Sequence, residues 1–313
     1  MSAITQPRLL TGAAALPNRR HRFLVTVAAS LAIAGILALT LYGFDYYGLN
    51  AVQRPLSPKH KILRPTGTLS LKLGQLSALM FVAIYLYPLR KRWEWLRRQG
   101  NSRHWLDFHV LLGLVAPITV AFHSSFKFQG IAGMAFWSMM AVSISGIVGR
   151  YLYSQIPRSI TATELSLQET EQAYAKSQQQ LAGQKGLNPQ TLQSLLHLPE
   201  KERVGRMGPL RALVAMMWLD ALHFARAAHL RRQALHGVDL FLTCGGLLSS
   251  RVHAVEQALL VARRHAALSK KMLFLSRAHR VFQLWHVIHR PFSYSFAVLA
   301  TLHILVALAF GVM

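Results

Sequence analysis

The sequence predicts an all-α, polytopic membrane protein with about five transmembrane helices and a helical cytoplasmic insertion. Apolar residues make up 52% of the 313 residues and charged residues only 15%, a composition that argues against disorder. Positive charge is in excess, with 35 Lys and Arg against 11 Asp and Glu. These cations cluster at the ends of apolar runs, as membrane topology signals do, and do not line one polar face. We therefore expect a lipid bilayer, and no nucleic acid, as a partner.

Five apolar runs are long enough to cross a hydrocarbon core of roughly 30 Å, which takes about 20 helical residues. They cover residues 23–44, 68–89, 105–126, 130–153 and 287–313. The first run is longer than the apolar part of a secretory signal, so we expect it to be retained as the first span.

The segment between the fourth and fifth spans is long and basic, with 17 Lys and Arg in residues 154–280. We therefore divide the chain into spans one to four with an N-terminal tail (1–153), a basic helical cytoplasmic insertion (154–280) and the fifth span (281–313). Apolar stretches at 209–224 and 237–248 are too short to span, and are either membrane-surface helices or packed cytoplasmic ones. After residue 249 an amphipathic helix is expected to run into the fifth span.

The distribution of lysine and arginine sets the expected orientation. The loop between spans two and three holds Arg90, Lys91, Arg92, Arg97, Arg98 and Arg103, whereas the next loop holds only Lys127. The first of these loops is therefore expected to be cytoplasmic, with the N-terminus inside and the C-terminus outside. The loop at 45–67 should lie outside. It is an exception to the rule, because it carries four cations, Arg54, Lys59, Lys61 and Arg64.

Histidines inside the third and fifth spans have a regular spacing. His109 and His123 are 14 residues apart, a turn of about 1400°, within about 40° of a whole number of turns, and a rise of about 21 Å. His289 and His303 repeat this spacing. Both spans should run in the same direction, which pairs His109 with His289 on the cytoplasmic side and His123 with His303 on the outer side.

Two facing imidazole pairs are what two b-type haems require, because each iron takes two axial nitrogens and the haem is held without a covalent bond. Cys244 is the only cysteine, so no CxxCH attachment site and no cysteine-ligated iron–sulfur cluster is encoded. Arg150 and Arg290 are candidate cofactor-binding cations for the anionic haem propionates. Topology anchoring explains both arginines equally well.

Several alternatives stay open. His286 competes with His289, although it lies about 100° from the face of His303, and His104 competes with His109. Asp107, at the start of the third span, either relays protons, binds a quinol or pairs with a nearby arginine. Most other histidines, including His21, His60, His197, His223, His229, His236, His253 and His265, sit among charges and are expected to face water or headgroups.

The four spaced histidines resemble those of the dihaem cytochrome b membrane domains of ferric reductases and NADPH oxidases, and the chain is also similar to cytochrome b561. The stretches FHVLLGLVAPITVAFHSSF and WHVIHRPFSYSFAVLATLHILVALAFG look like an uncharacterised bacterial group of cytochrome b-like proteins. The resemblance implies metal ligation by His109, His123, His289 and His303. It also implies a bacterial inner (cytoplasmic) membrane, with the C-terminus periplasmic.

The expected function is electron transfer between a cytoplasmic-side or quinol donor and a periplasmic acceptor. The expected redox partner is a quinol or an iron–sulfur protein, flavoprotein or multihaem cytochrome. The sequence has no GxGxxG fingerprint and ends after the fifth span, so we expect a subunit of an oxidoreductase rather than a self-sufficient enzyme. The alternative is a haem-free membrane scaffold, in which the histidines pack helices and the basic segment recruits an acidic partner.

Overall fold

The computed structural model describes residues 19–156, 163–164, 167–168, 171–172, 175, 198–234, 243–245, 247 and 253–311. All regular secondary structure in these residues is helical, which confirms the all-α prediction. Five stretches are long and apolar enough to cross a membrane, namely Arg19–Tyr47, His60–Arg90, Ser102–His123, Gly130–Gln155 and Leu275–Ala309. Each predicted span corresponds to one of them. By helix length and hydropathy, the chain is a multi-pass membrane protein.

The spanning helices present large apolar side chains on their outer surfaces. Leu31, Leu79 and Val298, on three different helices, are 68%, 66% and 68% exposed. Soluble monomers rarely leave contiguous apolar surface of this kind uncovered, whereas the acyl chains of a bilayer cover it.

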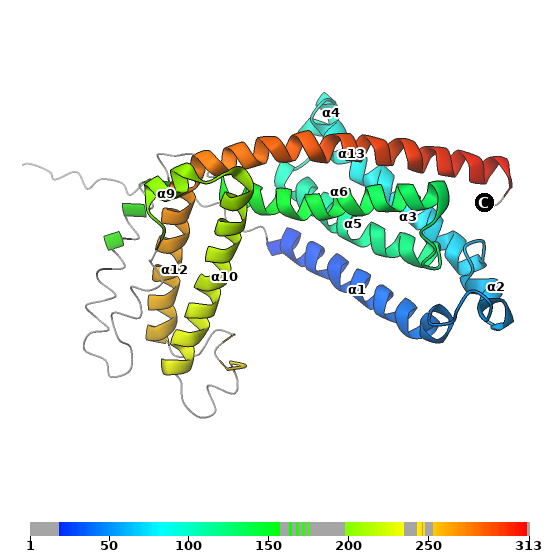
Figure 1. Ribbon diagram of the computed structural model, residues 1–313, viewed down its shortest axis with the longest axis horizontal. Coiled ribbons are helices and arrows are strands. Elements are labelled where there is room, and N and C mark those ends of the chain that lie inside the picture. Colours follow the sequence, from blue (N-terminus) through cyan, green and yellow to red (C-terminus); the bar gives the residue numbers. More distant parts are fainter. Residues whose placement is uncertain are drawn as a thin grey trace, which may run out of the picture. The chain divides into compact units, whose positions relative to one another are not determined.

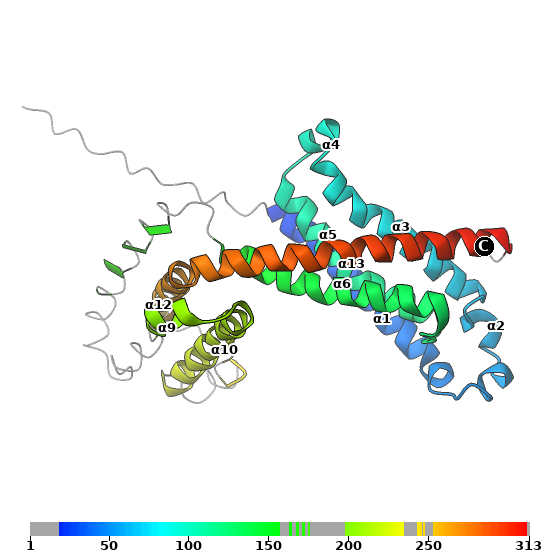
Figure 2. The ribbon, with the colours of Figure 1, turned by 45° about the horizontal axis from the view of Figure 1, so that its top comes forward.

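Backbone proximity divides the chain into two units, Met1–Ile147 with His289–Met313, and Val148–Ile288. In the first unit, α1 (Arg19–Tyr47), α3 (Thr68–Arg90) and α5 (Ser102–His123) lie together with parts of α6 (Gly130–Gln155) and α13 (Leu275–Ala309) (Figures 1 and 2). Helix α5 packs closely against α3 and also against α1. A small core joins four of these helices through Phe81, Ala121, Phe136, Met139 and Phe296.

The connection after α1 contains a 3-10 turn (Arg54–Leu56) and the short helix α2 (His60–Leu63). The Arg54 guanidinium donates hydrogen bonds to the backbone carbonyls of Tyr47 (2.9 Å), Leu49 (3.0 Å) and Ser125 (2.8 Å). Lys59 Nζ donates to another carbonyl of the same helix end. Cations at a helix C-terminus satisfy its last carbonyls and complement its dipole. Arg54 and Lys59, two of the four cations in the loop at 45–67 that did not fit the expected orientation, thus have a structural role.

Replacing Arg54 by glutamine should lower the free energy of unfolding by about 2 kcal/mol, because charged donors to several carbonyls are lost. Denaturant or thermal unfolding of the purified protein in detergent measures this change. Arg64→Gln is the matched control, since Arg64 is exposed in the same connection and should change stability by less than about 0.5 kcal/mol. Equal effects of the two substitutions would contradict the capping role of Arg54.

The second unit contains α9 (Lys201–Arg206), α10 (Pro209–Ala234) and α12 (His253–Leu273), together with the end of α6 and the start of α13. Its core includes Leu152, Val204, Met216, Phe274 and Val281.

The apolar stretch at 209–224 is part of a longer helix, α10, which packs against α12. One expectation about this unit is wrong. The expected continuous helix into the fifth span is interrupted at Phe274, because this side chain turns into the core, where it is 1% exposed. Most of the stretch at 237–248 lies outside the described residues.

A buried ionic group holds α10 to α12. Lys270 is 2% exposed, and its ammonium donates to Asp220, which also accepts a 2.7 Å hydrogen bond from the Tyr151 hydroxyl. Burial lowers the pKa of Lys270, and the hydrogen bond to Asp220 opposes this effect. His223, one turn after Asp220, is 8% exposed, and its buried Nε2 has no hydrogen-bond partner among the described residues. The expectation that His223 faces water is therefore wrong.

The stability of this unit should fall as the pH decreases below about 6.5. Burial lowers the pKa of His223. The negative charge of Asp220 opposes this effect, and the positive charges of Lys270, Arg226 and Arg263 add to it. The unfolded chain therefore takes up the proton first on acidification, and the stability lost is at most about 1.4 kcal/mol per pH unit. Unfolding temperatures between pH 7.5 and 5.5 measure this loss.

His223→Phe should remove part of the pH dependence. His229→Phe should keep it, because His229 is exposed on the same helix. Identical pH profiles for His223→Phe and the unmodified protein would contradict the assignment.

Candidate functional site

The outer histidine pair is brought together by the fold. His123 is the last residue of α5, and its ring centroid lies 6.5 Å from that of His303 on α13, with the ring planes inclined by 68°. This separation lies within the range of edge contacts between rings. It is also close to the roughly 6 Å expected when two imidazoles bind one metal through bonds of about 2 Å.

The orientation of the His123 ring is fixed by α3. His123 Nδ1 lies 2.8 Å from the backbone carbonyl oxygen of Ser70. Since a carbonyl only accepts, Nδ1 carries the hydrogen and Nε2 keeps its lone pair. Gly74 makes room for this ring, because a Cβ there would lie 2.7 Å from His123 Cε1. A hydrogen bond from one ring nitrogen to a carbonyl is the usual support of a histidine that binds metal through the other.

His109, earlier in α5, is held by a carbonyl of α3 in the same way as His123. Its Nδ1 lies 3.0 Å from the carbonyl oxygen of Ile84. Pro88, four residues later in α3, has no N–H with which to occupy this carbonyl, so the carbonyl is available to an outside donor. Ser70 and Ile84 are 14 residues apart, like the histidines that they accept from. Helix α3 therefore orients both rings of α5 in matching register.

His289 is held by α6. Its Nδ1 lies 2.7 Å from the hydroxyl oxygen of Ser145, which itself donates to the carbonyl of Val142 at 2.8 Å. Because the single hydroxyl hydrogen is used in that bond, the hydroxyl accepts from Nδ1–H, and Nε2 keeps the lone pair. Three of the four histidines are therefore in the tautomer that ligates metal through Nε2.

His286, the alternative to His289, has different surroundings. Its ring lies 4.5 Å from the ring of Phe282 and 4.6 Å from that of Trp285, centroid to centroid, and its Nδ1 lies 2.9 Å from the carbonyl oxygen of Phe282. These contacts are all within one helix. The bond to a carbonyl leaves Nε2 of His286 with its lone pair, as in His109 and His123, so His286 differs from His289 only in being held within its own helix.

The two arginines that were predicted to bind haem propionates, Arg150 and Arg290, belong to different units of the chain. Arg290 is exposed on α13, directly after His289. Arg150 is half-buried on α6 and belongs to the unit Val148–Ile288. Pairing of either arginine with a haem propionate stays a prediction.

A polar group that the sequence did not indicate lies at the start of α5. The ring of His21 from α1 stacks on that of His104, with centroids 3.6 Å apart and planes inclined by 16°. His21 Nε2 also lies 3.1 Å from Asp107 Oδ2. His21 is 9% exposed, so the expectation that it faces water is wrong. Packing of α1 against α5 brings together residues more than 80 positions apart, which no local pattern could signal.

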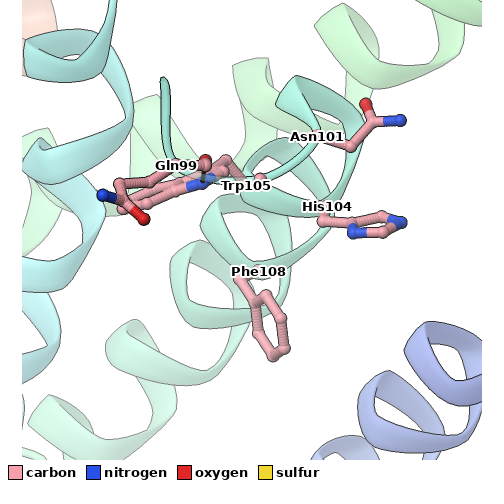
Figure 3. A pocket seen from close by; sticks show the side chains of 6 residues that line it. Gln99, Asn101, His104, Trp105 and Phe108 are labelled. Carbon is pink, nitrogen blue, oxygen red and sulfur yellow. Dashed lines mark hydrogen bonds between the residues drawn. The ribbon is translucent and has the colours of Figure 1, made fainter. Parts of the chain in front are cut away.

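An open pocket of about 420 Å³ adjoins this group, shown in Figure 3, and is lined by Gln99, Gly100, Asn101, His104, Trp105 and Phe108. The Trp105 indole is fixed by a 2.9 Å hydrogen bond from Nε1 to the carbonyl of Gln99. Mainly apolar and aromatic walls with a few polar groups are typical of small-molecule sites. The pocket lies at the same end of α5 as His109.

The structure brings His123 and His303 together, while the pairing of His109 with His289 stays a prediction. Within the described ranges, no group of three or more His, Cys, Asp or Glu side chains could hold a metal ion, whereas zinc sites use three or four protein ligands. Two histidines suffice for haem, because the porphyrin supplies the remaining ligands.

No protein-family model, curated protein or solved structure matches this chain. What the structure shows is a helical protein with five candidate membrane spans.

Proposed function

We propose that this chain is a dihaem cytochrome b that transfers electrons across a bacterial inner membrane. The observation that carries the proposal is the outer pair, in which His123 and His303 face each other at 6.5 Å while Nδ1 of His123 is bound to the Ser70 carbonyl. This arrangement presents Nε2 as an axial ligand. A noncovalent b-type haem held there supplies one-electron redox chemistry.

His109 and His289 are the proposed ligands of a second haem. Each has its Nδ1 hydrogen-bonded to a neighbouring helix, whereas Nδ1 of His286 is bonded within its own helix, and we therefore choose His289 over His286. The 14-residue spacing separates the two levels by about 21 Å, which places them toward opposite surfaces of a hydrocarbon core of roughly 30 Å. Arg290, directly after His289, is the proposed cation for a propionate of the inner haem.

The pocket at the start of α5 favours a quinol as the electron donor. Trp105 and Phe108 offer aromatic walls for a quinol ring, and His104 offers a ring nitrogen to its hydroxyl group. A protein donor, such as an iron–sulfur protein, flavoprotein or multihaem cytochrome, is the other candidate. With the orientation that the lysine and arginine distribution indicates, the donor reacts on the cytoplasmic side and the acceptor lies in the periplasm.

Transmembrane transfer is tested with liposomes that contain the protein and enclose ferricyanide, after addition of dithionite outside. The haem-loaded protein should accelerate ferricyanide reduction well above protein-free liposomes, and His303→Ala should return the rate to that background. A rate equal to the background for the unmodified protein would overturn the proposal.

The donor is tested separately by stopped-flow reduction of the haem-loaded protein in detergent. Trp105→Ala should slow reduction by a soluble quinol analogue and leave reduction by dithionite unchanged. Equal quinol rates in the two proteins would favour the protein donor.

A further inference from the structure

Helix α10 carries an apolar stripe that is exposed among the residues the structure describes. The stripe consists of five residues that are between 48% and 72% exposed: Leu210, Val214, Met217, Trp218 and Phe224. At 100° per residue they fall within about 120° of the helix circumference. Ala212 and Met216, on another side of the helix, are fully buried in the core of the second unit. The helix is thus apolar on a packed face and on an exposed one.

The start of α10 packs against the ends of two helices that are candidate membrane spans. Its Ala212 and Met216 share a core with Leu152 of α6 and Val281 of α13. From Val281 to the end of α13 there are 28 helical residues, a rise of about 42 Å, which matches the roughly 40–45 Å thickness of a bilayer with its headgroups. From the start of α6 to Leu152 the rise is about 33 Å, close to the hydrocarbon thickness alone. Both helices are therefore long enough to span a bilayer starting from the residues that α10 contacts.

Helix α10 meets α12 along one edge of its apolar stripe. Within the second unit, α10 and α12 run crosswise to the first turns of α13 (Figures 1 and 2). Asp220 and Arg231, which pair with α12, lie about 40° and 20° from Phe224 at one edge of the stripe, and about 80–100° from its centre. The centre of the stripe is therefore beside the α12 contacts and not under them.

The charges near the start of α10 suit an anionic surface. Lys201, Arg203, Arg206 and Arg211 are exposed there and outnumber the exposed acidic residues Glu200 and Glu202. Cations attract anionic headgroups, while an exposed tryptophan prefers the interface between headgroups and acyl chains.

We infer that α10 is an interfacial helix whose apolar stripe is inserted into the surface of an anionic phospholipid bilayer. This inference does not depend on haem binding. It also answers whether the stretch at 209–224 is packed or at the membrane, since α10 uses one face for each.

Spin labels at the stripe test the inference in the full-length protein. Val214→Cys and Trp218→Cys are each made in a Cys244→Ser background, labelled, and reconstituted in nanodiscs of phosphatidylethanolamine and phosphatidylglycerol. Gln233→Cys is the matched control, because it is exposed on the same helix beyond the stripe. Electron paramagnetic resonance then compares collisions of each label with oxygen, which concentrates in lipid, and with a water-soluble nickel chelate.

Labels at 214 and 218 should collide more with oxygen than with nickel, and the ratio should be reversed at 233. Arg203→Gln, Arg206→Gln and Arg211→Gln together should reduce the oxygen preference in anionic nanodiscs and not in phosphatidylcholine ones. A nickel accessibility at 218 equal to that at 233 would overturn the inference, because the stripe would face water. Low accessibility to both reagents would also overturn it, because protein would cover the stripe.

Discussion

Replacing His303 by alanine should lower the haem content of the purified protein from about two to about one per chain. The substitution removes one axial ligand of the outer site, while His123 remains held by the Ser70 carbonyl. A single imidazole without a covalent link holds haem weakly, so the outer haem should be lost during purification. A pyridine haemochrome assay, normalised to protein concentration, measures this loss.

The matched control is His279→Ala, which removes an exposed histidine from the same helix and should leave the haem content unchanged. A second variant, His303→Met, supplies a different axial ligand and should retain haem with a shifted reduction potential. This variant separates ligand loss from misfolding. An unchanged haem content and potential in both His303 variants would contradict the outer site.

Replacing Gly74 by alanine should also remove the outer haem, although this residue carries no ligand. A Cβ at this position would lie 2.7 Å from His123 Cε1 and 2.8 Å from its Nδ1, so the ring must move away from Ser70. Alanine is the better helix former by about 1 kcal/mol, and helix propensity alone would predict a stabilised protein. Haem content and unfolding temperature, measured together, distinguish the two expectations.

Gly35→Ala is the control for this substitution, because a Cβ at Gly35 meets nothing within 4 Å. It should keep both haems and a stability equal to or above that of the unmodified protein. Retention of both haems in Gly74→Ala would show that the orientation of the His123 ring does not matter for binding.

The spans were predictable because hydropathy over about 20 residues is a strong and local signal. The predicted fourth run at 130–153 corresponds to Gly130–Gln155 in the structure, and the fifth helix begins earlier, at Leu275. The break at Phe274 was not predictable, because it depends on a core that residues from several distant segments form together.

The outer histidine pair followed from spacing alone, since equal intervals on parallel helices place side chains at equal levels. The groups that orient the rings could not be predicted from the spacing. Backbone carbonyls have no sequence signature, and only Pro88 gives an indication, because it frees the carbonyl of Ile84 four residues earlier. The stacking of His21 on His104 likewise depends on helix packing across the bundle.

The measurement that tests the central claim most directly is the haem content of the unmodified protein. Purified protein, supplied with haem during expression, should contain about two haems per chain, removable by acidic acetone and with b-type haemochrome spectra. Both should be low-spin and six-coordinate by electron paramagnetic resonance, as bis-histidine ligation requires. A colourless protein, or one with fewer than two haems per chain, would contradict the claim and leave the histidines as helix-packing residues of a scaffold.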